Sequence, residues 1–204
     1  MRFRKCLISA GWKIGCRHSA ISSPRRMSNV VSCAITLPIA FALVQRINAH
    51  LAEPDCAGVV VTHGTDTLEE TAYFLDITVL TKKPIVLTAA MRNINELGTD
   101  GPRNIFSSIR VACSTQAIGA GAVVCLNDEI HAAREVNKTY TSNVATFESP
   151  GFGPLGIVDE DGVFFFRKST VRYHIPTTKI EPHVALLKTY TGDLGEFIDY
   201  AVDK

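Results

Sequence analysis

Two side chains with reactive groups stand side by side just after a short apolar run. Val59, Val60 and Val61 are consecutive β-branched residues, typical of a strand buried on both faces, and Thr65 and Asp66 follow them. Nucleophilic attack on a carbonyl group needs a nucleophile, a group that removes its proton, and donors for the oxyanion. Thr65 offers a hydroxyl nucleophile or a group that positions water, and Asp66 offers a carboxylate that could hold an ammonium group.

A lysine further along the chain could supply the base. Lys138 would do so in its neutral form, which burial favours, although by residue type alone it is an ordinary solvated loop lysine. Thr67-x-x-Glu70 is a capping-box signature, which predicts a helix start whose backbone N–H groups could stabilise a developing negative charge. Open α/β sheets bind their ligands beyond the carboxyl ends of strands, so this turn is the expected site.

Strands and helices alternate from residue 57 onward. Apolar runs predict strands over residues 57–62, 84–90 and 121–126, and helices are predicted over residues 68–80 and 102–114. This alternation predicts an α/β fold with a mainly parallel sheet, with right-handed crossovers as the default.

The remainder of the chain predicts shorter elements. Residues 157–166 are typical of a hairpin across the Asp161-Gly162 turn. A strand is predicted over residues 184–187 and a helix over residues 194–204. A strand and a helix without a return strand make only half of a βαβ unit.

The composition indicates a globular protein without an unusual partner. The chain has 204 residues, of which 46% are hydrophobic and 20% charged, and its formal net charge is +1. This balance gives no reason to expect nucleic acid or an acidic membrane as partner. His63 and His131 lack the spacing of metal ligands, and Pro154 lies inside the Gly-x-Gly-x-x-Gly match over residues 151–156. No metal and no cofactor are expected.

The first thirty residues differ in composition from the rest. They contain Arg2, Arg4, Lys5, Lys13, Arg17, Arg25 and Arg26 but no acid, and the first acid of the chain is Glu53. Three interpretations compete for this segment: an organellar transit peptide, a secretory signal before the apolar residues 30–44, and the product of a shifted reading frame or a misplaced start codon.

Several motifs along the chain occur in the order of one known family. They are residues 62–76, residues 84–92, residues 100–104, Asn127-Asp128 with residues 134–139, and residues 152–156. This series resembles the bacterial-type L-asparaginase family from about residue 31 to residue 204. The resemblance implies a doubly wound, mainly parallel α/β/α sheet with one rare left-handed crossover, followed by a smaller α/β domain of which only the start is expected here.

The resemblance also implies roles for individual residues. Thr65, Lys138 and Asp66 would form the family's second Thr-Lys-Asp triad, with Asp66 also contacting the substrate's α-amino group. Gly64 and Ala90 would line the pocket for the amide.

A serine in the same series matches with one departure. Ser32 resembles the family serine that helps to hold the carboxylate end of the substrate. Ala34 stands where the family commonly has an acidic residue two places later, which weakens the match.

One family motif has no counterpart in this sequence. The family carries its primary nucleophile in a Thr-Gly-Gly-Thr-Ile motif, followed by a tyrosine on a flexible loop. Residues 1–56 contain neither that motif nor any tyrosine, and their only threonine is Thr36. The expected organisation is therefore an anomalous basic segment over 1–30, an asparaginase N-terminal domain over 31–180 without its first strand motif, and a linker with the start of a truncated C-terminal domain over 181–204.

The function expected from these observations is that of an L-asparaginase, which hydrolyses L-asparagine to L-aspartate and ammonia, in a chain that is weakly active or inactive. Two alternatives stay open: a non-catalytic product of a truncated or frameshifted gene, and a related amidotransferase subunit. The expected partners are L-asparagine or L-glutamine as substrate and other copies of the chain in a homotetramer, a dimer of dimers. Cytoplasmic localisation is expected, or a periplasmic or organellar one if the N-terminal segment is a targeting peptide.

Overall fold

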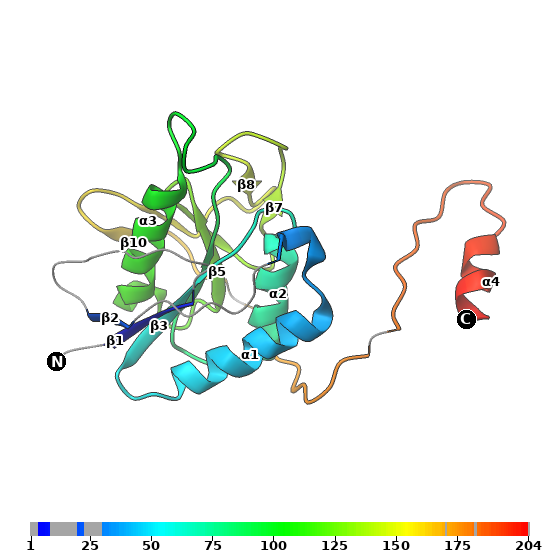
Figure 1. Cartoon of the computed structure of the whole chain (residues 1–204), viewed down its shortest axis with the longest axis horizontal. Coiled ribbons are helices and arrows are strands. Elements are labelled where there is room, and N and C mark those ends of the chain that lie inside the picture. Colours follow the sequence, from blue (N-terminus) through cyan, green and yellow to red (C-terminus); the bar gives the residue numbers. More distant parts are fainter. Residues whose placement is uncertain (1–3, 9–19, 23–29, 170, 182, 204) are drawn as a thin grey trace.

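An eight-stranded sheet forms the centre of the molecule (Figure 1). The computed structural model describes residues 4–8, 20–22, 30–169, 171–181 and 183–203. In chain order the elements are β1 (Arg4–Ile8), β2 (Ala20–Ser22), the 3-10 turn η1 (Ser32–Ala34), α1 (Leu37–Leu51), β3 (Cys56–Thr62), α2 (Leu68–Thr78), β4 (Ile85–Thr88), α3 (Gly101–Cys113), the 3-10 turn η2 (Thr115–Ala117), β5 (Ala122–Leu126), β6 (Glu129–Ala132), β7 (Asn137–Lys138), β8 (Phe147–Glu148), β9 (Gly156–Val158), β10 (Val163–Phe165) and α4 (Glu196–Val202).

The sheet is mixed, with its parallel part in the middle. Its strand order is β10-β9-β6-β5-β4-β3-β1-β2, and all neighbours from β5 to β2 are parallel, whereas those from β5 to β10 are antiparallel. Val60 of β3 lies beside Val86 of β4, which lies beside Val123 of β5, and all three are buried. The α/β fold and the three central strands predicted from the sequence are confirmed.

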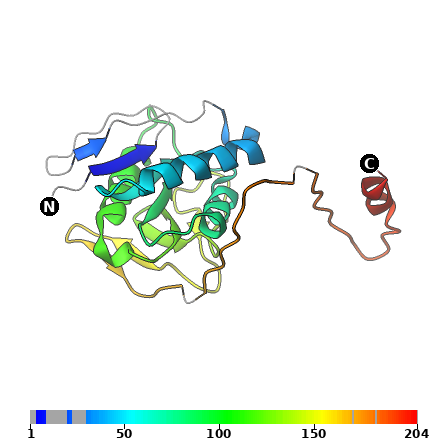
Figure 2. The ribbon, with the colours of Figure 1, turned by 90° about the horizontal axis from the view of Figure 1, so that it is seen from below.

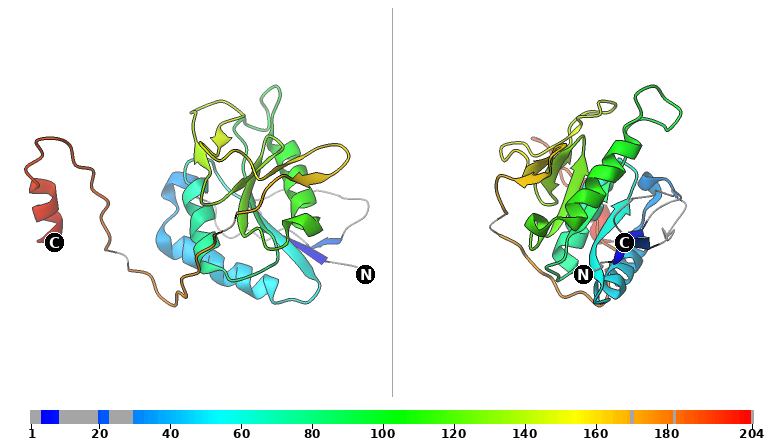
Figure 3. Two further views of the ribbon diagram at one scale, coloured as in Figure 1. Left: turned by 180° about the vertical axis from the view of Figure 1, so that it is seen from behind. Right: turned by 90° about the vertical axis from the view of Figure 1, so that its left-hand side faces the viewer.

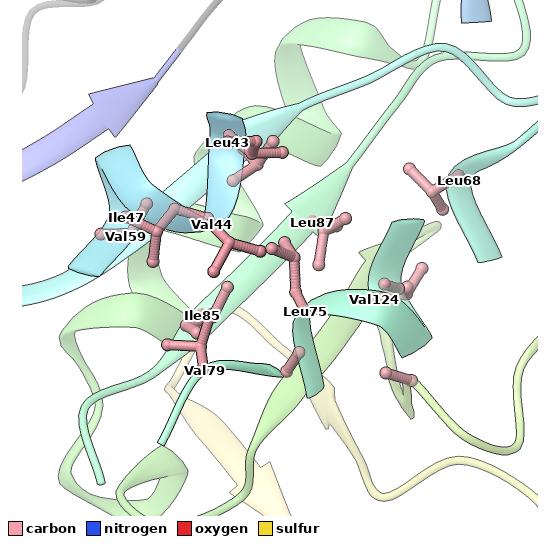
Figure 4. Close-up of a cluster of buried hydrophobic side chains, with 14 of the residues drawn as sticks. Leu43, Val44, Ile47, Val59, Leu68, Leu75, Val79, Ile85, Leu87 and Val124 are labelled. Atoms are coloured by element: carbon pink, nitrogen blue, oxygen red, sulfur yellow. The ribbon is translucent and has the colours of Figure 1, made fainter. Parts of the chain in front are cut away.

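Helices cover both faces of this sheet and give it three layers. Side chains of α1 and α2 pack on one face, where Val44 and Leu75 meet Val59 and neighbouring strand residues (Figure 4). On the other face, Ile105 and Ile109 of α3 pack against the alternate strand residues. Successive side chains of a strand point to opposite faces, so an unbroken apolar run serves both helix layers.

The two helical crossovers in the middle of the sheet have opposite hands. The chain steps from β3 to β4 through α2 and from β4 to β5 through α3, in the same direction along the sheet. Because α2 and α3 lie on opposite faces, one crossover is right-handed and the other left-handed. The right-handed default predicted from the alternation is therefore wrong for one crossover, and the left-handed crossover implied by the resemblance is present.

Gly58 is required by the close approach of β3 to its neighbours. A Cβ atom at this position would lie 2.8 Å from the carbonyl oxygen of Pro84 and 2.9 Å from that of Ala112. Both contacts are with backbone, which cannot move aside as a flexible side chain can. The glycine therefore allows β3 to pass between the start of β4 and the end of α3.

The predicted N-terminal segment 1–30 lies largely outside the described residues. Its two described stretches, β1 and β2, are strands of the main sheet, and β1 pairs in parallel with β3. The boundary predicted near residue 180 stays a prediction.

Arg172 attaches the start of the C-terminal part of the chain to α2. Arg172 donates from Nε to Asp76 Oδ1 at 3.0 Å and from its other nitrogens to the carbonyls of Asp76, Thr81 and Val79 near the end of α2. The Ile175 N–H then donates to the carbonyl of Ile77. Beyond this point the chain runs away from the sheet towards α4, as the other views also show (Figure 2, Figure 3).

Two predictions for the C-terminal part have different outcomes. The helix predicted over 194–204 is present as the shorter α4. The strand predicted over 184–187 is wrong, because no described strand lies beside this segment and its Leu186 is 91% exposed. A strand requires a partner edge for its backbone groups, and an apolar run alone does not supply one. Within the described residues, no helix combines the length and the apolarity needed to cross a bilayer.

Candidate active site

The turn that carries Thr65 and Asp66 lies at the carboxyl end of β3. It connects Thr62, the last residue of β3, with the first turn of α2. Thr62 pairs with Thr88 at the end of parallel β4, so the residue that follows shortly after, Ala90, lies on the same edge of the sheet. Ala90 is exposed and joins none of the hydrogen bonds described below.

Ser32 approaches this turn from η1 and binds it in three places. Ser32 Oγ donates to Asp66 Oδ2 at 3.0 Å and accepts from the Asp66 N–H at 3.2 Å. The Ser32 carbonyl accepts from Thr67 Oγ1 at 2.8 Å. Ser32 is buried, and Gly64 is packed so closely on it that a Cβ there would lie 2.5 Å from Ser32 Oγ. Ser32 is therefore engaged with Asp66, the residue expected to share the substrate with it.

The predicted capping box is wrong in its hydrogen bonds, although Thr67 is the N-cap residue of α2. No side chain caps the helix at this position, because the Thr67 hydroxyl donates to the Ser32 carbonyl instead. Glu70, the other half of the signature, is exposed. A contact with a segment distant in sequence has taken the hydroxyl that a local cap would use.

Lys138 reaches the same turn from the opposite side. Its Nζ donates to Thr65 Oγ1 at 3.0 Å and to Asp66 Oδ1 at 3.3 Å. The Lys138 side chain is 20% exposed and that of Asp66 is 56% exposed, so the ion pair lies at the rim of the body. Thr65, Asp66, Lys138 and Ser32 are thus brought together from three segments of the chain.

These contacts favour the ionised form of the Asp66 carboxyl group. The Ser32 hydrogen bond is the largest influence that lowers the pKa of Asp66, followed by the hydrogen bond and the positive charge of Lys138. Asp66 is consequently a carboxylate at neutral pH. One of its oxygens faces Ser32 and the other Lys138, and its exposed surface leaves room for a cationic group of a ligand.

Comparison with known proteins decides the family. A family model described as "Asparaginase, N-terminal" matches residues 13–171, which is most of the chain. The chain belongs to the L-asparaginase family. The matched region begins inside the basic segment, so the asparaginase similarity extends further towards the N-terminus than the motifs suggested.

Individual asparaginases give the extent of the similarity. L-asparaginase 2 of Bacillus subtilis (strain 168) is 40% identical over 187 residues, covering 88% of this chain and 49% of the relative. L-asparaginase of Bacillus licheniformis is 42% identical over 171 residues, covering 84% and 53% respectively. The chain thus spans about half the length of these curated relatives. The crystal structure of a probable cytoplasmic L-asparaginase from Campylobacter jejuni matches with a TM-score of 0.88 and 32% identity, over 100% of this chain and 70% of that chain.

A buried asparagine organises the loops beside the site of this asparaginase-family chain. Asn104 Nδ2 donates to the Ala89 carbonyl and to Asp100 Oδ2, and Asn104 Oδ1 accepts from the Asn127 N–H. Asp100 in turn accepts from the N–H groups of Met91 and Arg92. The sequence motif that contains Asp100 and Asn104 indicates no role for either residue. Only their partners, distant in sequence, reveal that they hold the loop after β4.

The two histidines considered as metal ligands have other partners. His63 Nδ1 contacts the Gly64 carbonyl at 2.7 Å and its Nε2 contacts Thr71 Oγ1 at 3.0 Å. His131 is buried between Ser149 Oγ and Glu129 Oε2. Desolvation is the main cause that lowers the pKa of both imidazoles. Among the residues that the structure describes, no group of three His, Cys, Asp or Glu side chains is arranged to hold a metal ion.

Proposed function

We propose that the protein is an L-asparaginase-type amidohydrolase, which converts L-asparagine and water to L-aspartate and ammonia. The observation that carries this proposal is the contact of Lys138 Nζ with both Thr65 Oγ1 and Asp66 Oδ1, at 3.0 Å and 3.3 Å. Membership of the family supports the reaction class, and the names of the Bacillus relatives support L-asparagine as the substrate. L-Glutamine is the second substrate to test.

The contacts support a different role for each residue at the turn. The Thr65 hydroxyl would attack the carboxamide carbon or position water for the attack. The proton of the attacking oxygen would pass to Lys138, which would first have to give up the proton that it carries in its ion pair with Asp66. The carboxamide C–N bond then breaks, and the nitrogen takes that proton from Lys138 and leaves as ammonia. Where Thr65 is the nucleophile, water then hydrolyses the ester on Thr65, which releases L-aspartate and restores the hydroxyl. The ionised Asp66 would hold the α-ammonium group of the amino acid, and Gly64 and Ala90 would line the space for the amide.

A missing sequence motif limits the proposed activity. Residues 1–56 contain no Thr-Gly-Gly-Thr-Ile sequence, so Thr65 is the only family nucleophile that this sequence retains. Loss of a nucleophile typically lowers turnover by several orders of magnitude. We therefore propose that this chain binds the amino acid but hydrolyses it weakly or not at all, and a non-catalytic product of an altered gene is the alternative. A homotetramer and a cytoplasmic location are proposed with it, the latter supported by the name of the Campylobacter jejuni relative.

Binding and turnover should be measured separately on the full chain. Calorimetric titration with L-asparagine and with L-glutamine should show binding that Asp66→Ala abolishes and that Asp161→Asn, on the exposed loop between β9 and β10, retains. Ammonia release should be far below that of a full-length relative. Absence of binding, or equal binding by Asp66→Ala, would contradict the proposed site, and rapid ammonia release would contradict the limited activity. Thermal melting shows whether the chain folds cooperatively, which the decayed-gene alternative does not require.

A further inference from the structure

A carboxylate of α2 holds the backbone of the lysine that enters the site. The Lys138 N–H donates to Glu69 Oε2 at 2.5 Å, across 69 positions of sequence. Glu69 lies in the first turn of α2, directly after the turn that carries Thr65 and Asp66. Both ends of Lys138 are therefore attached to one short stretch of chain: its amide to Glu69 and its ammonium to Thr65 and Asp66.

The strand that bears Lys138 follows a segment fixed by the Val136 N–H and by the Glu135–Arg167 ion pair, but it is not itself part of the central sheet. β7 and β8 have two residues each and form a sheet separate from the central one, beside the start of α2 (Figure 1). Val136 and Phe147 bury their side chains in the core and hold this hairpin against the body. Apolar burial is not directional, however, whereas a hydrogen bond to a backbone amide fixes where the strand lies along its own length.

We propose that Glu69 is a positioning residue, whose carboxylate fixes β7 so that Lys138 Nζ reaches Thr65 and Asp66. The inference rests on the proposed site but not on its turnover. A purely structural interpretation competes with it, because an acidic residue in the first turn also stabilises a helix through the helix dipole. Glu70, the next residue of the same turn, is exposed and provides the matched control for that effect.

Two conservative substitutions of Glu69 separate the effect of its side-chain length from the effect of its charge. Glu69→Gln keeps an oxygen acceptor at the same distance from the backbone but removes the charge. Glu69→Asp keeps the charge but shortens the side chain by one methylene group, so the carboxylate no longer reaches the Lys138 amide. Glu70→Gln removes a neighbouring charge without a contact to Lys138, and Lys138→Met removes the ammonium group itself.

The readout is the pKa of Asp66, measured by NMR titration of its carboxyl carbon in the folded chain. Lys138 lowers this pKa through a hydrogen bond and through its charge, so Lys138→Met should raise it. Glu69→Asp should raise it towards the value in Lys138→Met. Glu69→Gln and Glu70→Gln should not raise it, because the loss of a nearby negative charge acts in the opposite direction.

An unchanged pKa in Glu69→Asp, or an equal rise in Glu69→Gln, would overturn the proposal. If Glu69→Asp does not fold, hydrogen exchange of the Lys138 amide in the parent chain decides: protection supports the inference, and exchange as fast as in exposed loops refutes it. None of these measurements needs substrate. The pKa measurement therefore stays valid for a chain that releases no ammonia. A negative result for Glu69 likewise does not decide whether the chain hydrolyses L-asparagine.

Discussion

Gly64 lies against Ser32 at a point where the body has no room for a side chain. An ideal Cβ on Gly64 would lie 2.5 Å from Ser32 Oγ and 2.7 Å from Ser32 Cβ. Ser32 is only 6% exposed and its carbonyl is bound by Thr67, so its hydroxyl cannot turn aside without losing the two hydrogen bonds with Asp66. Gly64→Ala must therefore displace the contact that holds the Asp66 carboxylate.

The size of the effect follows from three contributions. Forcing an extra methyl group into a packed region costs about 1–3 kcal/mol. Each hydrogen bond lost from Ser32 adds about 1 kcal/mol. Gly64 does not have a left-handed backbone, so alanine offsets about 0.4–1 kcal/mol by restricting the unfolded chain. The expected result is a decrease of about 1–4 kcal/mol in the free energy of unfolding, since the steric contribution and one lost hydrogen bond outweigh the gain.

Urea unfolding of four variants tests this reasoning. Gly162→Ala is the matched control, because its new methyl group would be in ordinary contact with the ring of Phe164 and should change the free energy of unfolding by less than about 0.5 kcal/mol. Ser32→Gly removes the obstacle, so Gly64→Ala should cost about 1–2 kcal/mol less in that background than in the parent. The reasoning is refuted if Gly64→Ala is as stable as the parent, or if its cost is the same in both backgrounds.

Three further predictions concern parts of the body outside the turn. Arg172→Met should lower the free energy of unfolding by about 2–3 kcal/mol in urea, because the Asp76 carboxylate stays buried without its ion-pair partner; a change below about 0.5 kcal/mol would contradict this. His131 has a pKa lowered below its usual 6.5 by burial, so its contribution to stability is present above that pH and is lost as the pH falls through the folded-state pKa. His131→Gln should therefore lose less stability on acidification than the parent, and the exposed His183→Gln should not differ from it. Burial raises the pKa of the Cys125 thiol to about 12, so peptide mapping should find it unlabelled by iodoacetamide until urea unfolds the chain; rapid labelling of the folded protein would contradict its burial.

Local sequence patterns were sufficient to predict the central strands, because a strand buried on both faces is recognisable from its own apolar run. The apolar run ending at Val61 and the similar run of β4 each serve two helix layers, and a continuous run is what such a strand requires. The family motifs supplied the left-handed crossover, which periodicity cannot indicate, because the same alternation of elements is compatible with either hand.

The parts that sequence reasoning missed depend on partners distant in the chain. Thr67 has the type and position of a capping residue, but its hydroxyl donates to the carbonyl of Ser32 in η1. Glu69 and Asn104 carry no sequence signal for what they bind, since their partners lie in other segments of the chain. The family motifs assigned roles to Thr65, Asp66 and Lys138, whereas residue type alone is also compatible with ordinary turn and cap residues and a solvated loop lysine. For residues 184–187, an apolar run predicted a strand that lacks a neighbouring edge in the described structure.

The way in which the site is joined implies that it is less stable than the sheet. The central strands from β3 to β6 each pair with the next of these strands in the chain, and their side chains are buried between helices on both faces. Ser32 and Lys138 instead bind the turn across 34 and 73 positions, one from before these strands in the chain and the other from after them. Because the Lys138–Asp66 pair is partly exposed, we expect these contacts to open at a free energy below that of global unfolding. The site is then a cooperative unit separate from the more stable sheet. Substitutions in the segments that carry Ser32 and Lys138 can alter or abolish the site without unfolding the sheet.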